Sequence, residues 1–449
     1  MKRSVILLAI IALAAVSANA QSFQQALFLD GYQLGYRYNP ALANESAFLS
    51  VGQWENQFRN NVGAASFLYP RNGEVVTALH ESVSADEFLG SLKDDNYLTG
   101  NIHFNLFSYG WKGEKAYHTI EAGIRAAYSA SVPKEIFSIV KLGTGDQNYD
   151  LSGMNVSGNA VLELAYGYSR KLSDLISVGA RAKLLVGIEA LRYNVTRFDL
   201  TLTEDAYQAQ VEADLDLTSR WSKIRPDDEG YLNLTDLSSK ERWKLPSGAG
   251  LALDLGVVVT PLEGLTLSAS LLDLGGILWY YGNAGKSQGT TTFTGMDSVT
   301  MDDLKQGNLK EQFNDELDAF VRSIKIKSVN GRTAFEAVPL HVNLGARYEM
   351  PFYRPLSIGA TTTYYGVHGM PYCELRGAVA WNPYSWLGVS ANAGAGSYGA
   401  LWGFSANAAF KQFRLMLAMS NGFGGTIPYS STPLQPNAKT LTLGLSYCL

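Results

Sequence analysis

The sequence predicts an all-β fold, a transmembrane antiparallel β-barrel of about fourteen strands. Three observations favour this class. The chain begins with an export signal, its composition is low in charge and rich in tyrosine and glycine, and long segments alternate between apolar and polar residues. A soluble β-sandwich is the alternative for many alternating strands, but the export signal and the length of the strands favour the barrel.

Residues 1–20 have the features of a secretory signal peptide. They begin with the basic residues Lys2 and Arg3, continue with an apolar run, and end at an A-x-A cleavage site. The alternative is a membrane anchor, but the apolar run is shorter than the ~20 residues that a spanning helix needs. We therefore expect cleavage after Ala20, a mature chain that starts at Gln21, and export to the outer membrane.

The composition excludes several kinds of partner and site. Charged residues make up 17% of the chain, below the ~25% of ordinary soluble domains, while aromatic residues reach 12%. The net charge of −5 argues against a nucleic-acid partner, which would require a basic surface. Two cysteines, Cys373 and Cys448, are too few for a disulfide framework.

Alternation with period two is clearest at the C-terminus, where five apolar residues from Leu441 to Leu449 are separated by small or polar residues. One apolar and one polar face is what a lipid-facing barrel wall requires. A last strand that ends on an apolar residue resembles the signal read by the barrel-insertion machinery, although that signal usually ends on Phe. The predicted strands are 47–68, 97–109, 116–131, 153–170, 175–191, 248–260, 265–282, 338–350, 355–368, 372–383, 386–397, 401–410, 413–421 and 438–449.

The connections between these strands alternate in length, which sets the orientation. Short connections such as 261–264 alternate with long ones, the longest being 192–247 and 283–335. Outer-membrane barrels have short periplasmic turns and long extracellular loops, so both termini should lie in the periplasm. Aromatic residues near strand ends, including 279–281 and 364–365, are expected to form interfacial girdles.

Three segments outside the strands carry their own signals. Residues 21–46 are rich in tyrosine and apolar residues, which favours a plug inside the barrel over a disordered tail. Ser84 to Glu87 form a capping box that predicts a short helix. Helical spacing of apolar residues predicts a second helix over 302–322, and the alternation over 193–218 predicts a hairpin that projects beyond the membrane.

Charged residues on the predicted inward faces are the candidate functional residues. They could line a selective or gated path, or pair with one another and fill the lumen. We favour the paired network, because unpaired charge inside a narrow barrel is costly. The candidates are Glu121, Arg125, Glu163, Arg181, Lys183, Asp254, Arg347, Glu374 and Arg376.

The sequence predicts no enzyme, cofactor or metal site. Residues 394–399 match G-x-G-x-x-G, but a dinucleotide site needs a helix after the glycines, and the flanking residues here predict strands of a hairpin. The five histidines show no metal-binding spacing, and no G-x-S-x-G elbow is present.

Five segments carry a resemblance to a known group of proteins, namely 38–42, 82–88, 177–185, 254–256, and 271–275 followed by Trp279. On these residues the chain resembles barrel proteins of Bacteroidota that lie near the long-chain fatty-acid transporter superfamily, which also contains the type IX secretion shuttle barrel. The resemblance is to a family of unassigned function, and it implies a fourteen-strand barrel with an N-terminal hatch in which Asn39, Pro40 and Ala41 lie. The excursions 192–247 and 283–335 are larger than in the fatty-acid transporters.

By this analogy, the leading expectation is uptake of a hydrophobic or amphiphilic small molecule. The alternative is a scaffold or shuttle that does not transport and that partners with secretion or surface machinery. A lipid hydrolase lacks a recognisable Ser/His/Asp set. Outer-membrane lipid and the barrel-insertion machinery are the other expected partners.

Overall fold

The structure is a computed structural model. It describes residues 23–44, 46–143, 147–203, 206–219, 223–238, 246–293, 325–367, 370–397, 399–420 and 437–449. The predicted signal peptide 1–20 and the predicted helix 302–322 lie outside these residues. None of the helices within them is long and apolar enough to cross a membrane.

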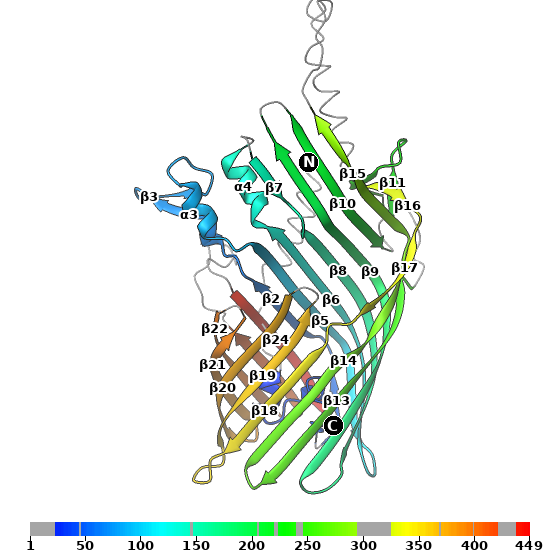
Figure 1. Ribbon diagram of the computed structural model, residues 1–449. Coiled ribbons are helices and arrows are strands. Elements are labelled where there is room, and N and C mark those ends of the chain that lie inside the picture. The colour runs from blue at the N-terminus through cyan, green and yellow to red at the C-terminus, as the bar shows by residue number, and fades with distance from the viewer. Residues whose placement is uncertain are drawn as a thin grey trace, which may run out of the picture.

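The described residues form a closed antiparallel β-barrel of 14 strands (Figure 1). The barrel closes where β24 pairs with β1 and β2. The first barrel strand is split into β1 and β2, and every predicted strand has a counterpart. In chain order the barrel strands are β1 (Phe48–Ser50) with β2 (Gln53–Asn60), β5 (Asp95–Lys112), β6 (Tyr117–Pro133), β8 (Asn155–Lys171), β9 (Ile176–Leu202), β13 (Gly248–Leu262), β14 (Leu265–Tyr281), β18 (His341–Glu349), β19 (Leu356–Val367), β20 (Met370–Tyr384), β21 (Leu387–Gly396), β22 (Gly399–Phe410), β23 (Phe413–Ser420) and β24 (Asn437–Cys448).

The strands meet in short turns at one end of the barrel, here called the turn end, and in long excursions at the other, the loop end (Figure 1). The glycine-rich residues 394–399 join β21 to β22 as a hairpin, as predicted. The remaining elements are α2 (Phe23–Phe28), η1 (Gly35–Arg37), η2 (Ala64–Ser66), β3 (Leu68–Arg71), β4 (Glu74–Thr77), α3 (Ala85–Gly90), α4 (Lys134–Leu142), β7 (Gln147–Asp150), β10 (Tyr207–Thr218), β11 (Lys223–Pro226), β12 (Leu232–Ser238), β15 (Asn283–Phe293), β16 (Lys327–Val329) and β17 (Arg332–Ala337).

One side of the barrel extends far past the rest at the loop end (Figure 1). β9, which is 27 residues long in all, continues into this extension, and β10 pairs with β9 on one side and with β15 on the other. The pairing of β9 with β10 forms the hairpin predicted over 193–218. The predicted short helix is also present as α3, and at its start the Ser84 side chain accepts a hydrogen bond from the Glu87 backbone N–H. The helix α4, which the sequence analysis did not predict, lies close to α3.

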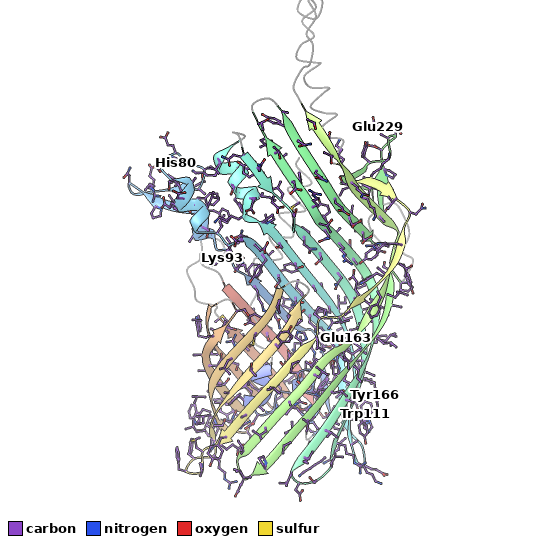
Figure 2. All side chains as sticks on the ribbon, viewed as in Figure 1. His80, Lys93, Trp111, Glu163, Tyr166 and Glu229 are labelled. Atoms are coloured by element: carbon purple, nitrogen blue, oxygen red, sulfur yellow. The ribbon has the colours of Figure 1, made fainter. Side chains whose placement is uncertain are left out.

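The two faces of the barrel wall differ as a membrane barrel requires. Outward-facing apolar side chains such as Leu251 and Leu415 are 69% and 57% exposed, whereas inward polar side chains are buried. Near the turn end Trp111 stacks on Tyr109 and His118, with ring centroids 5.5 and 5.3 Å apart (Figure 2). These rings form part of the predicted aromatic girdle.

A β-bulge in β14 changes which side chains point inward. Two residues, Leu272 and Asp273, lie opposite one position of β13, and Asp273 has a left-handed backbone with φ of 65°. A bulge shifts the alternation of every later residue in its strand. Consequently Trp279 and Tyr281 are buried inside, with 0% and 2% exposure, so their predicted place in the girdle was wrong. Tyr365 of β19 likewise points inward, because its neighbour Tyr364 takes the outward position.

The N-terminal segment 26–44 crosses the lumen and contacts the wall on several sides; we call it the hatch. Leu27 and Phe28 pack against Ala378 and Ala380 of β20. Farther along, Asn39 bonds to β13 and β14, on another part of the wall. Buried contacts on separate strands hold the segment inside the barrel.

Candidate functional site

Arg181 of β9 is the centre of a buried ion-pair network inside the barrel. Its guanidinium lies 3.0 Å from Glu121 of β6, 2.8 Å from Glu163 of β8 and 3.1 Å from Asp254 of β13. The side chains of all four residues are at most 3% exposed. Antiparallel pairing places these strands side by side, and alternation points the four residues inward. One cation therefore joins carboxylates from three strands.

The network continues through Lys183, two residues farther along β9. Its ammonium lies 2.7 Å from Asp254 and 2.8 Å from Asp273. Asp273 also binds Arg125 at 2.8 Å and His341 Nδ1 at 3.2 Å, and its backbone N–H donates to Asp254 at 2.8 Å. Because of the bulge in β14, the Asp273 carboxylate points inward and contacts Lys183, Arg125 and His341.

The hatch adds its own charged and hydroxyl groups to this network. Arg37 lies 3.3 Å from Glu121 and 3.9 Å from Glu55 of β2. Burial alone lowers the pKa of Arg37, but Glu121 and Glu55 outweigh it and raise this pKa above its ordinary value, so the guanidinium stays charged. Tyr36 donates to Glu121 at 2.7 Å and Tyr38 donates to Glu55 at 2.5 Å.

The hydroxyl of Tyr38 remains a hydrogen-bond donor because of its surroundings. Burial, and then the negative charge of Glu55, raise the pKa of Tyr38 well above its ordinary value. The backbone carbonyl of Tyr38 also accepts from Ser270 at 2.6 Å and from Asn343 at 3.2 Å. The hatch is therefore bound to the wall by both its side chains and its backbone.

Asn39, Pro40 and Ala41 occupy a notch in the wall. The buried Asn39 amide donates to Ser268 at 2.7 Å and to the carbonyls of Val257 and Ala269 at 3.1 and 3.2 Å, and it accepts from the Ala41 N–H at 2.9 Å. Two glycines make room for them. A Cβ at position 179 would lie 2.2 Å from the Pro40 backbone, and one at 256 would lie 1.9 Å from Asn39 Oδ1.

The other predicted site residues lie apart from the Arg181 network. Arg347 of β18 binds Asp30 of the hatch at 2.6 Å and donates to the Leu27 carbonyl at 3.2 Å. Arg376 and Glu374 pair with each other on β20 at 2.9 Å. The structure thus brings six of the predicted residues into one network and uses the other three elsewhere. The six are Glu121, Arg125, Glu163, Arg181, Lys183 and Asp254.

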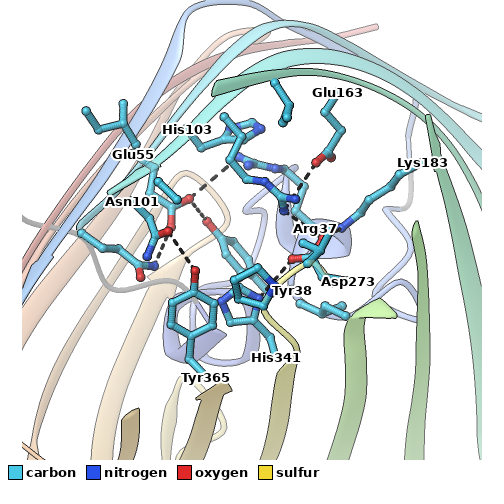
Figure 3. Close-up of a pocket in the computed structure, with 18 of the residues that line it drawn as sticks. Arg37, Tyr38, Glu55, Asn101, His103, Glu163, Lys183, Asp273, His341 and Tyr365 are labelled. Atoms are coloured by element: carbon cyan, nitrogen blue, oxygen red, sulfur yellow. Dashed lines mark hydrogen bonds and ion pairs between the residues drawn. The ribbon is translucent and has the colours of Figure 1, made fainter. Parts of the chain in front are cut away.

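A cavity of about 160 Å³ lies beside this network (Figure 3). Its wall has a charged part, formed by the network and the hatch residues Arg37 and Tyr38, and an aromatic part that includes Tyr365 and His341. The apolar part is formed by Ile102, Val161, Leu185, Leu272, Ile277, Trp279 and Val338. Such a wall fits a small molecule with both apolar and polar groups.

Three of these residues could in principle hold a metal ion. Ligand atoms of His103, Glu121 and Glu163 lie within 4.8 Å of one another. However, Arg181 contacts both carboxylates at 2.8 to 3.0 Å, and a divalent cation placed there would be strongly repelled at this distance in a buried site. We therefore assign no metal to the cluster.

Several residues of the site were missed by sequence reasoning. Strict alternation assigns Asp273 to the lipid face, and only the bulge turns it inward. Arg37 belongs to a segment without periodicity. A usable signal did exist in β2, where Gln53, Glu55, Gln57 and Arg59 are polar at every second position.

Several solved structures are similar to this chain over most of its length. The Pseudomonas putida toluene transporter TodX has a TM-score of 0.45 at 10% identity, with 96% of each chain covered. The Ralstonia pickettii toluene transporter TbuX has a TM-score of 0.44 at 9% identity, covering 96% of this chain and 98% of that one. A Pseudomonas aeruginosa FadL homologue has a TM-score of 0.43 at 11% identity, covering 96% and 99%.

Likeness at these scores and identities carries no argument about function. No curated protein matches the chain at a significant level. The profile of a protein family, in contrast, matches residues 40–420, which is most of the chain. This family is described as DUF5723, a family of unknown function, and the chain belongs to it.

Proposed function

We propose that this chain is an exported outer-membrane barrel that takes up a small hydrophobic or amphiphilic molecule. The observation that carries the proposal is the lumen cavity, whose wall combines apolar side chains with charged and hydroxyl groups. Small-molecule sites are typically concave and mainly apolar, with a few polar groups that orient the ligand. The proposal assigns no catalytic step to the chain.

The size of the cavity suits a compact molecule. At about 160 Å³ it is comparable to an engineered apolar cavity of about 150 Å³ that binds benzene. A molecule held there faces the hatch, since Arg37 and Tyr38 form part of the wall. Transit toward the turn end therefore requires the hatch to move.

The experiment compares two adjacent alanines on β6. Ala127 lines the cavity, whereas Ala126 lies on the opposite face of the strand. Purified protein is placed in vesicles whose outer leaflet contains lipopolysaccharide, and the entry rate of radiolabelled 4-ethylphenol is measured. We expect the wild-type chain and Ala126→Phe to accelerate entry equally, and Ala127→Phe to do so several-fold less.

Equal entry rates with and without the wild-type chain would contradict uptake. In that case the alternative, a scaffold that partners with surface machinery through the long arm of β9, β10 and β15, would be tested by gentle co-purification. Equal rates for Ala127→Phe and the wild type would show that passage does not use the cavity.

A further inference from the structure

Arg59 of β2 packs against two tyrosine rings at the wall of the cavity. Its Cζ lies 4.2 Å from the ring centroid of Tyr372 and 5.3 Å from that of Tyr365. One of its terminal nitrogens donates to Gln57 at 2.8 Å. The residue is 7% exposed and lines the cavity, so its cation is largely buried against aromatic rings.

This cation differs from the other arginines of the cavity wall. Arg37, Arg125, Arg181 and Arg376 each have a carboxylate within 4.0 Å. Within the part of the chain that the structure describes, no carboxylate lies that close to Arg59, and its Nη1 is buried without a hydrogen-bond partner. A buried cation in this state is costly, and an anion that enters the cavity would relieve the cost.

Two carboxylates of the cavity wall that bond to neighbours of Arg59, Glu374 and Glu55, are already engaged. Glu374 accepts from Arg376 at 2.9 Å and from the Tyr372 hydroxyl at 2.5 Å. On the other side, Gln57 donates to Glu55 at 3.2 Å, and Glu55 in turn accepts from Tyr38 of the hatch. Gln57 thus lies between Arg59 and Glu55 in this chain of hydrogen bonds. The Nη1 of Arg59 remains available to donate a hydrogen bond to a bound ligand.

We propose that Arg59 binds the negatively charged group of a compact organic anion, such as a small aromatic carboxylate or sulfonate. This inference rests on the proposed uptake function and adds the charge and size of its substrate. A guanidinium presents parallel N–H donors that match a carboxylate or sulfonate. The apolar part of the same cavity receives the ring, and the cavity volume of about 160 Å³ suits a single ring better than a long chain or a large ring system.

The test uses detergent-purified full-length chain and a matched pair of probes. Benzenesulfonate is permanently charged, and methyl phenyl sulfone has a similar shape without the charge. Binding is measured by titration calorimetry for the wild type, Arg59→Gln, Arg59→Lys and the control Arg354→Gln, whose side chain is 68% exposed in a turn. Heat-modifiable migration on a gel verifies that each variant is a folded barrel.

We expect Arg59→Gln to weaken benzenesulfonate binding by about 10- to 100-fold, the loss of one hydrogen bond to a charged group. Arg59→Lys should weaken binding less, and Arg354→Gln should leave it unchanged. Binding of methyl phenyl sulfone should be the same in all four proteins. Pyrene-1-sulfonate, which carries the same charge on four fused rings, should not displace benzenesulfonate.

Two further results distinguish the anion site from the proposed uptake function on which it rests. If the neutral probe binds while benzenesulfonate does not, or if both Arg59 variants bind benzenesulfonate as the wild type does, the anion site is refuted and uptake of neutral molecules stands. If neither probe binds the wild-type chain, both proposals are contradicted. Displacement by pyrene-1-sulfonate would overturn the limit on size.

Discussion

Buried cations contact carboxylates in one region of the lumen, whereas in a second region a buried cation has no carboxylate in contact among the described residues. In the region around Arg181, four cations are joined to five carboxylates by contacts shorter than 4.0 Å. Nearer the loop end, Arg59 packs against two tyrosine rings, and no carboxylate among the described residues contacts it. Charge inside this barrel therefore has two uses. Paired charge fills the lumen and fixes the hatch, and the unpaired cation is left for a ligand.

The largest effect is expected from breaking the paired region. Arg181→Ala leaves Glu121, Glu163 and Asp254 without their shared cation. We expect a loss of about 3–5 kcal/mol in the free energy of unfolding, as for other broken buried ion pairs. Asp254→Ala should cost less, because Arg181 and Lys183 keep other partners. Urea unfolding of the protein in lipid vesicles measures both.

The double variant of Arg181 and Asp254 tests whether the two residues act as partners. Its cost should be smaller than the sum of the two single costs, because the second change removes a charge that the first left unpaired. Additive and near-zero costs, together with altered ion selectivity of the barrel, would show instead that these residues line an open, solvent-filled pore.

A smaller effect is expected from disturbing the notch that holds the hatch. Gly256→Ala places a methyl group 1.9 Å from Asn39 Oδ1, so either the hatch or the wall must shift. We expect a cost of about 1–3 kcal/mol, typical of overpacking, and a higher conductance in planar bilayers. Gly377→Ala is the control, since its nearest atom would be 3.9 Å away. Unchanged conductance and stability in Gly256→Ala would mean that the notch does not position the hatch.

The smallest effect sharpens the contrast between buried and exposed pairs. Arg354 and Glu263 form an ion pair at the turn end, with side chains 68% and 79% exposed. Arg354→Ala should cost about 0–1 kcal/mol, because water and salt screen exposed pairs. A cost as large as that of Arg181→Ala would mean that burial does not explain the strength of the central network.

Most of the barrel could be predicted because one physical rule governs it. A strand between lipid and lumen must alternate between apolar and polar residues. The sequence of 441–449 and of the other strands therefore shows which side chains face the lipid. The inward placement of Arg181 and Lys183 follows from the same rule. Predicted and observed strands differ mainly at the ends, and β9 runs on into the arm.

The rest of the site depends on departures from that rule. The bulge at Leu272 and Asp273 reverses the alternation, so the sequence places Asp273 and Trp279 on the wrong face. The hatch has no period at all, and its contacts come from strands far away in sequence, such as Glu121 for Arg37. Pairing between distant residues cannot be derived from local pattern. This is why six members of the network were predicted from alternation, whereas Arg37 and Asp273 were missed.

The central claim is that the Arg181 region carries stability while Arg59 is free to carry binding. The most direct measurement is the free energy of unfolding of Arg181→Gln and Arg59→Gln, determined side by side in the same vesicles. We expect Arg181→Gln to lose about 3–5 kcal/mol. Arg59→Gln should lose no more than about 1 kcal/mol, because the ring contacts and the hydrogen bond that it removes are offset by relief of an unpaired buried cation. An equal loss in both variants would contradict the claim, because Arg59 would then be a structural residue like Arg181.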